Sequence, residues 1–324
     1  MVAVPIPADA HNAPTVVLLL PGDPPWVVDP GPDTPAALAA LEAGLESHGV
    51  DVDSLGGVVC THAHGHHAGL AARVATRSEV RIVCHPMAAQ TLVQPEDAAL
   101  ATRERLRRVG HAAAVPQPLV LAAIEATGPV SSQPAPPAML SALDNGRRLM
   151  LGERKWKVLH TPGHSPDHIG LFEPRSGSFL GGDLLVRGRP TRTVLDGVGP
   201  AFAGDRRLEA LRTSWRLVGR LAVRRLWPSH GPPSRAHRLL VARRLAKLRR
   251  RLQEARRSVA DGAVTVWDVI EAAAETPPPA ALSAVLGDTV ARLEWLCRHG
   301  HLTRTDRGGH ACYKLRRPRG SARG

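Results

Sequence analysis

The chain has 324 residues, which is enough for two domains of ordinary size or one large one. Hydrophobic residues make up 43% and aromatic residues 3%, so a core can form but aliphatic side chains must fill it. The net charge of +13 comes almost entirely from arginine, which favours anionic partners without implying nucleic acid. Four scattered cysteines and the lack of a long apolar N-terminal segment argue against secretion and membrane insertion, and predict a cytoplasmic protein.

Strands and helices are expected to alternate in the first part of the chain. Apolar segments between Pro and Gly predict a strand hairpin at 16–20 and 26–28. Thr34 is a candidate N-cap for a helix that ends near His48. A charged helix is expected at 96–108, and further strands at 57–60, 79–84, 157–160, 169–172, 179–181 and 226–230. This order is typical of an α/β sandwich.

Composition divides the chain into segments. Residues 1–233 are predicted to be the catalytic domain, with the Ala- and Pro-rich segment 115–140 as an insertion or lid. Residues 234–258 are predicted to form a basic linker helix, with Leu239, Leu240, Leu245, Leu248 and Leu252 as its apolar stripe. Residues 259–316 are predicted to form a winged helix, and 317–324 a disordered basic tail.

The winged-helix prediction depends on three expected helices and a hairpin. The first helix follows Thr265 and ends near Ala274, and the second follows the prolines at 277–279. The third is expected to start at Asp288 and end at Gly300. Two strands, 301–305 and 310–315, then flank the turn at 306–309.

A run of histidines directly follows the predicted strand at 57–60: His62, His64, His66 and His67. Neutral imidazole is a common zinc ligand. His62 and His64 lie two residues apart on an extended segment, so they share one face and can hold one metal together. His67 lies on the next turn and faces a neighbouring position. A histidine run without function is expected at a terminus, not between a strand and a helix.

Further ligand-type residues follow later strands, each beside Gly or Pro: His164, Asp183 and His230. Each one alone is more often an ordinary loop residue, so the prediction depends on the whole set. A carboxylate can bridge two cations, which imidazole cannot readily do. Asp183 is therefore the expected bridge between two metals about 3.5–4 Å apart.

These motifs resemble the metallo-β-lactamase superfamily. The matching pattern, across residues 12–231, is Thr-His-x-His-x-x-His-x-Gly, then Pro-Gly-His, Gly-Asp and a late His-Gly. The resemblance implies an αββα sandwich for residues 1–233, with Asp29 as a structural residue near the metal loops. It implies one metal held by His62, His64 and His164, and a second held by His67, Asp183 and His230, with Asp183 shared.

His66 departs from the family pattern, which usually has Asp at this position to bind the second metal and orient the attacking hydroxide. His66 could ligate through nitrogen, could leave the second metal weak or absent, or could mark a degenerate site. A nitrogen-rich ligand set favours zinc over manganese or magnesium, so two zinc ions are expected. The sequence does not decide whether the second zinc site is occupied. Asp183 and His66 are the expected catalytic residues.

The expected activity is hydrolysis by a metal-bound hydroxide, with His168 as a candidate supporting residue or loop hydrogen-bonding residue. One substrate class is a small anionic thioester, ester or lactone, as in glyoxalase II, enclosed by the lid and met by Arg187, Arg189 or Arg192. A second is RNA, because the domain order and residues 161–168 resemble the β-lactamase-like endoribonucleases.

Two observations limit the RNA hypothesis. Trp267, Trp295 and Tyr313 are the only tail aromatics that could stack on bases, and packing is expected to bury them. Winged helices also serve as packing or dimerisation modules, so a homodimer is an alternative partner prediction for this segment. A third hypothesis is a metal-poor binding protein that has lost catalysis.

Overall fold

The computed structural model of the chain describes residues 1–7, 14–195 and 201–316, so the predicted tail at 317–324 lies outside the described residues. The chain folds into two compact units. Unit 1 consists of Met1–Leu100, Gly128–Thr191 and Ala210–Ala242. Unit 2 consists of Ala101–Thr127, Arg192–Glu209 and Arg243–Gly324. The domain boundaries expected from composition stay a prediction.

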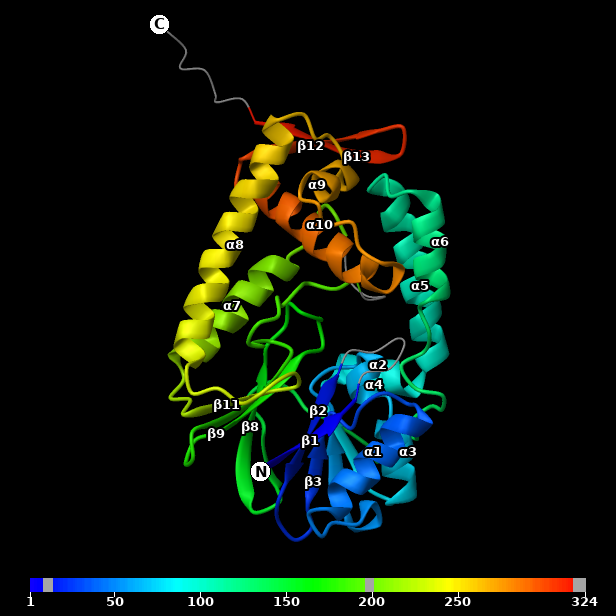
Figure 1. Ribbon diagram of the computed structural model, residues 1–324, viewed down its shortest axis with the longest axis vertical. Helices are drawn as coiled ribbons and strands as arrows, with labels where there is room; N and C mark the ends of the chain where they lie inside the picture. The colour runs from blue at the N-terminus through cyan, green and yellow to red at the C-terminus, as the bar shows by residue number, and fades with distance from the viewer. Residues whose placement is uncertain (8–13, 196–200, 317–324) are drawn as a thin grey trace, which may run out of the picture. The chain divides into compact units, whose positions relative to one another are not determined.

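Unit 1 contains two mixed β-sheets (Figure 1). The first has the order β1 (Val2–Ile6), β2 (Thr15–Leu20), β3 (Trp26–Val28), β4 (Gly57–Val59), β5 (Arg81–Cys84) and β6 (Leu140–Ala142). It is parallel from β3 to β6 and antiparallel elsewhere. The second has the order β11 (Arg225–Pro228), β10 (Ser178–Gly182), β9 (Ile169–Glu173), β8 (Arg154–His160) and β7 (Arg148–Leu151). Only its β10–β11 pair is parallel.

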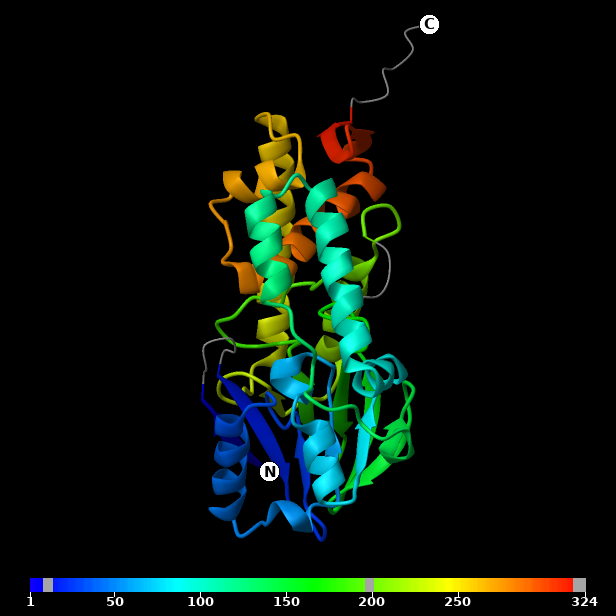
Figure 2. The same ribbon diagram turned by 90° about the vertical axis from the view of Figure 1, so that its right-hand side faces the viewer.

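Alternating side chains of the first sheet enter two separate cores. On β2, Val17 and Leu19 belong to the core that includes residues of helices α1 (Pro35–Glu46), α3 (Ala71–Arg77) and α4 (Pro86–Val93). Leu18 and Leu20 belong to the other core, which includes Trp156 and residues of β9 and β10 from the second sheet. Neighbouring strand residues point to opposite faces. Figures 1 and 2 show α1 and α3 against one face of the first sheet. The expected α/β sandwich of two sheets is confirmed.

Local signals account for several of these elements. Thr34 caps α1, because its backbone is extended and its side chain accepts a hydrogen bond from the Ala37 N–H at 3.2 Å. The strands expected at 16–20 and 26–28 form β2 and β3. The strands β1, β6 and β7 were not expected, because their short segments lack a clear alternation. Helix α6 (Gln117–Glu125) occupies part of the expected insertion, and a 3-10 helix, Pro137–Met139, lies near its end.

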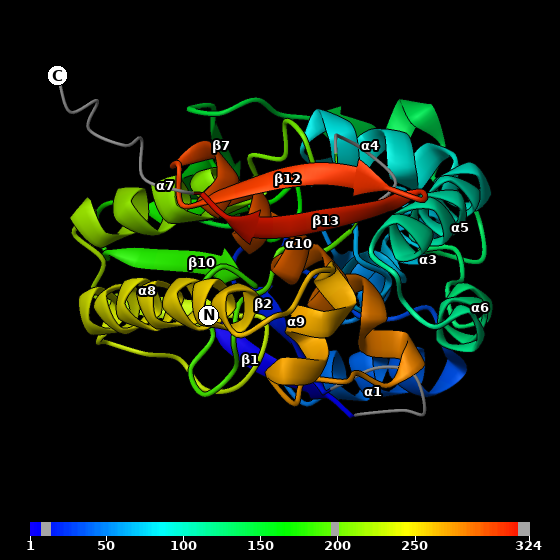
Figure 3. The same ribbon diagram turned by 90° about the horizontal axis from the view of Figure 1, so that it is seen from above.

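The remaining helices belong to unit 2 or cross between the two units. They are α5 (Pro95–Ala112), α7 (Arg207–Arg220), α8 (His237–Ala260), α9 (Val266–Ala272) and α10 (Leu282–Arg298). A two-stranded sheet of β12 (Leu302–Arg307) and β13 (His310–Leu315) follows. Figure 3 shows this hairpin beside α10. Two further short elements are α2 (Gly65–Ala68) and a 3-10 helix, Val52–Ser54.

Two expectations for this region were wrong. A single helix, α10, replaces the expected second and third helices, and a 3-10 helix, Pro279–Ala281, precedes it. Asp288 lies inside α10 and forms an ion pair with Arg292 one turn later, so it does not cap a helix. The apolar stripe of α8 also differs from the expected one. Leu239 is 49% exposed, and the buried stripe is Val241, Leu248, Leu252, Ala255 and Val259.

Candidate metal centre

The seven candidate ligand residues follow strands of unit 1, either on loops or on the short helix α2. His62 and His64 follow β4, and His66 and His67 lie on α2 immediately afterwards. The others follow strands of the second sheet: His164 after β8, Asp183 after β10 and His230 after β11. Because β8, β10 and β11 run in the same direction, their carboxyl ends meet at one edge of the sheet.

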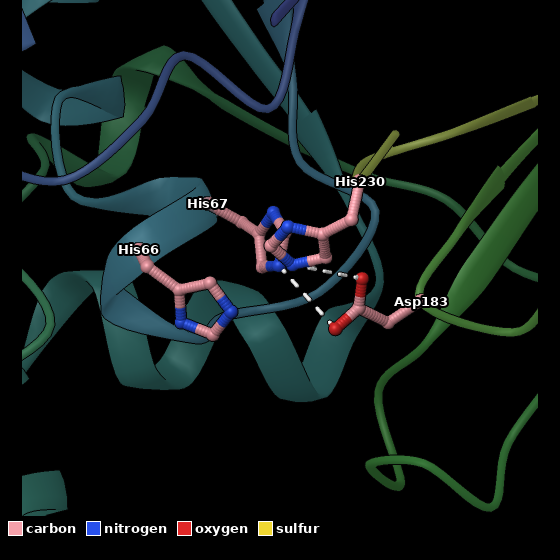
Figure 4. A group of neighbouring side chains, drawn as sticks. All are labelled: His66, His67, Asp183 and His230. Carbon is pink, nitrogen blue, oxygen red and sulfur yellow. Dashed lines mark ion pairs between the residues drawn. The ribbon is translucent and has the colours of Figure 1, made fainter. Parts of the chain in front are cut away.

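Seven side chains from four separate segments of the sequence thus form two groups with metal-ligand chemistry. The ligand atoms of His62, His64 and His164 lie within 4.8 Å of one another, as do those of His66, His67, Asp183 and His230. In the first group, Nε2 of His164 lies 3.1 Å from Nδ1 of His64. Figure 4 shows the second group, with His67 and His230 facing the Asp183 carboxylate and His66 beside them. The structure therefore brings all the expected residues together.

Asp183 contacts both groups. Its Oδ2 lies 3.5 Å from Nε2 of His67 and 3.5 Å from Nε2 of His164, while its Oδ1 lies 3.4 Å from Nε2 of His230. Burial raises the pKa of Asp183, but the nearby imidazoles outweigh this effect and hold the pKa well below its ordinary value. The carboxylate is therefore ionised and placed as expected for a bridging ligand.

His66 belongs to the second group. Its ring centroid lies 4.0 Å from that of His67 and 5.6 Å from that of His230. Burial, together with the neighbouring imidazoles of His67 and His64, lowers the pKa of His66 well below its ordinary value. A neutral imidazole at this position offers a nitrogen lone pair where the family usually has a carboxylate.

Hydrogen bonds fix the tautomers of two candidate ligands. The Thr61 hydroxyl donates to Oδ2 of Asp29, so it can only accept from Nδ1 of His62, 3.0 Å away. Nδ1 of His230 donates to the Pro14 carbonyl at 2.6 Å. In both residues Nε2 is left without a proton. Among the described residues, the buried Nε2 of His62 has no hydrogen-bond partner. Such donor sets fit a bound cation.

Asp29 connects the loops that carry the ligands. Its carboxylate accepts hydrogen bonds from the Thr61 N–H at 2.7 Å, the Thr61 hydroxyl at 2.8 Å and the Ser229 hydroxyl at 2.8 Å. Thr61 precedes His62, and Ser229 precedes His230. Asp29 has a φ of 54°, a left-handed conformation that Asp tolerates better than most residues. These contacts match the structural role that the resemblance implies.

His168 lies behind Asp183 and is fully buried. Its Nε2 accepts a hydrogen bond from the Asp183 backbone N–H at 3.2 Å, so its Nδ1 donates to the Thr161 hydroxyl at 2.8 Å. Burial lowers the pKa of His168 to about 3, which keeps the ring neutral. A Cβ at Gly182 would lie 2.6 Å from Nε2 of His168, so only glycine fits there. The sequence analysis did not decide whether His168 supports the metal ligands or only forms a hydrogen bond within its loop.

The candidate anion-binding arginines differ in their surroundings. Arg187 and Arg189 are exposed, and the charge of Arg189 contributes to lowering the pKa of His230, after burial and the imidazole of His67. Arg192 instead forms an ion pair with Glu275 at 3.6 Å. The charge of Arg189 therefore reaches a candidate ligand, His230.

Comparison with known proteins identifies the family. The family described as the metallo-beta-lactamase superfamily matches residues 12–230, which is more than half of the chain. The chain belongs to this superfamily. Its relatives include the probable metallo-hydrolase YqjP of Bacillus subtilis, which is 28% identical over 295 residues and covers 84% of each chain. The family and this relative identify the chain as a metal-dependent hydrolase.

Solved structures extend the similarity beyond the family region. A metallo-beta-lactamase family protein from Thermus thermophilus has a TM-score of 0.79 at 23% identity, covering 97% of this chain and 98% of that one. A beta-lactamase domain protein from Burkholderia ambifaria has a TM-score of 0.77 at 21% identity, covering 97% and 92%. At these identities the likeness concerns the fold. None of the helices in the described residues is long and apolar enough to cross a membrane.

Proposed function

We propose that the chain is a zinc-dependent hydrolase of small thioesters, esters or lactones, with two zinc positions that share Asp183. The observation that carries this proposal is the position of Asp183 Oδ2, 3.5 Å from a histidine of each group. His62, His64 and His164 would hold one ion, and His66, His67, Asp183 and His230 the other. The predominance of imidazole nitrogen supports zinc over manganese or magnesium.

Zinc ions bound here would supply Lewis-acid chemistry, activating a water molecule and polarising the substrate carbonyl. Asp183 is ionised and can accept a hydrogen bond from that water. Hydrolysis adds water across the acyl bond and releases a carboxylic acid with a thiol or an alcohol. His168 holds the Asp183 backbone from behind, and Arg189 would bind a negative charge on the substrate.

Buried aromatic residues support a small substrate over RNA. Trp267 and Tyr313 are only 7% and 3% exposed, and Trp295 stacks on His299 at 3.7 Å between ring centroids. These rings leave few faces on which single-stranded bases could stack.

An endoribonuclease is the second candidate. Exposed arginines of α8, including Arg243, Arg249 and Arg256, favour it because they could contact phosphates. In either case we propose a winged-helix module at 259–316 that packs or dimerises.

Metal content and turnover test the proposal together. We expect about two zinc ions per chain by elemental mass spectrometry, and turnover of at least one of p-nitrophenyl acetate, a short acyl thioester and a γ-lactone. The Asp183→Asn variant should lose about 100-fold or more in kcat/KM, because the neutral amide cannot replace the bridging charge.

Three other outcomes would contradict the proposal. Two bound zinc ions with cleavage of a single-stranded RNA and no acyl hydrolysis would favour the second candidate. Neither zinc nor turnover would favour a binding protein that has lost catalysis. Unchanged kcat/KM in Asp183→Asn would exclude the bridging role.

A further inference from the structure

Two adjoining hollows in unit 1 are lined by arginine side chains. The larger, about 610 Å³, is lined by Arg154, Arg224, Arg225 and Arg235 among others. The smaller, about 330 Å³, shares Arg224 and Arg235 and adds Arg238. We call these two hollows together the arginine groove, defined by Arg154, Arg224, Arg225, Arg235 and Arg238. Their volumes are in the range of small-molecule sites.

The arginine groove lies at the opposite end of β10 and β11 from the metal centre. Ser178 at the start of β10 lines the groove and pairs in register with Arg225 at the start of β11. Asp183 and His230 follow the other ends of the same two strands. At about 3.3 Å per strand residue, the two sites are roughly 15 Å apart. The groove is therefore separate from the candidate metal centre.

The positive charge of the groove is largely uncompensated. Arg154 forms an ion pair with Glu173 at 3.7 Å. In the part of the chain that the structure describes, the other four arginines form no ion pair, and all are exposed. Several guanidinium groups around one concave surface create a strong positive potential. Guanidinium also matches the geometry of phosphate oxygens, with two parallel hydrogen bonds.

Each hollow also has a buried nitrogen without a protein partner in its wall. Trp227, 8% exposed, lines the larger hollow, and its Nε1 has no hydrogen-bond partner among residues 1–7, 14–195 and 201–316. His237, 5% exposed, lines the smaller one. It is hydrogen-bonded to the Leu221 backbone, yet its Nε2 has no partner in the same residues. Both nitrogens are closed off from solvent, so the exposed arginines, and not these two groups, are what a ligand in the groove would meet.

We propose that the arginine groove binds a small molecule that carries a di- or triphosphate chain. The limited volumes of the two hollows favour a small ligand over a nucleic acid strand. The Trp227 indole in the wall of the larger hollow is also unsuited to base stacking, because the Arg225 guanidinium lies over its ring, 5.3 Å from the centroid. Phosphate oxygens would bind between the side chains of Arg224 and Arg235, which belong to both hollows.

The test uses inorganic tripolyphosphate and isothermal titration calorimetry on the zinc-loaded full chain. Arg224→Ala/Arg235→Ala is compared with Arg249→Ala/Arg256→Ala, which removes the same charge from exposed positions of α8. Both variants keep the metal centre, so any binding or chelation there affects them equally. We expect about tenfold or greater loss of affinity in the first variant and less than about twofold in the second.

Several outcomes would overturn the proposal: no binding to the wild type, equal losses in the two variants, or an unchanged affinity in Arg224→Ala/Arg235→Ala. Tighter binding of a ten-nucleotide single-stranded RNA, also lost in that variant, would make the groove a nucleic-acid surface instead. Titration with ATP distinguishes an inorganic phosphate chain from a nucleotide as the ligand. Binding equal to tripolyphosphate indicates recognition of the phosphate chain alone, and tighter binding indicates a nucleotide. Failure here leaves the proposed hydrolase function unaffected, since acyl hydrolysis is measured separately.

Discussion

His168 and Asp183 are joined through the backbone, because the Asp183 N–H donates to Nε2 of His168 at 3.2 Å while the Asp183 carboxylate faces the histidines of both groups. His168 is in turn held by the Thr161 hydroxyl at 2.8 Å. The candidate bridging ligand is thus oriented by a neutral, buried imidazole that need not bind metal itself.

We therefore expect His168→Ala to weaken zinc binding by roughly 10- to 100-fold, because Asp183 loses the acceptor that holds its backbone. Competition with a zinc chelator measures this effect. His48→Ala, at an exposed histidine outside the centre, should leave the affinity unchanged. Wild-type zinc affinity in His168→Ala would show that Asp183 is held by its own loop.

His66 should act as a ligand of the second zinc. Removing its imidazole in His66→Ala should lower the zinc content from about two to about one per chain, while His66→Asp should keep about two. Elemental mass spectrometry of dialysed protein gives these values. His66→Asp should also bind manganese more tightly than the wild type does, because it replaces nitrogen by oxygen. Two zinc ions in His66→Ala would contradict the assignment.

The stability of the metal-free chain should depend on His85 in acid. Burial, with the imidazole of His160 beside it, lowers the pKa of His85 to about 4 in the folded state, below its ordinary 6.5. The unfolded chain therefore binds the proton more readily. The contribution of His85 is fully present above pH 6.5 and is lost as the pH falls toward 4.

His85→Asn tests this dependence without removing the helix cap, because Asn can replace the Nδ1 that accepts the Met87 N–H. Urea unfolding at pH 7.0, 5.5 and 4.5 should show a smaller decrease in the free energy of unfolding for the variant than for the wild type. If the free energy of unfolding falls equally with pH in the variant and the wild type, His85 binds its proton equally well in the folded and unfolded chain.

Asp288 should be essential to the packing of unit 2. Its Oδ2 lies 3.0 Å from Nη1 of Arg251 and 3.3 Å from Nε of Arg292, and the Arg292 side chain is buried. Asp288→Ala leaves the buried Arg292 dependent on the more distant Glu275 carboxylate, 3.9 Å away, which already pairs with Arg251, and should cost about 3–5 kcal/mol. Glu42→Ala, which breaks the exposed pair with Arg77, should cost less than about 1 kcal/mol. Urea unfolding measures both, and similar losses would show that the buried network adds little.

The sequence alone determined most of the fold of unit 1 and the membership of the candidate centre. The strands that carry His62, His164, Asp183 and His230 are recognisable because apolar runs and neighbouring Gly or Pro act over a few residues. The division of the ligands between two metal positions then came from the resemblance to the metallo-β-lactamase superfamily. The cap at Thr34 is equally local, because it depends on residues three positions apart.

Only the tertiary structure decided how distant residues meet. The contacts of Asp29 with Ser229, of Pro14 with His230 and of His168 with Asp183 join separate loops, and no local pattern encodes them. Within the continuous helix α10, Asp288 pairs with Arg251, which lies on another helix. Arg224 and Arg235 likewise share the arginine groove only because β11 and the loops around it bring them together. The intrinsic preference of a short segment for helix or strand is worth little energy. Burial and charge pairing between distant residues therefore decide the conformation at these positions.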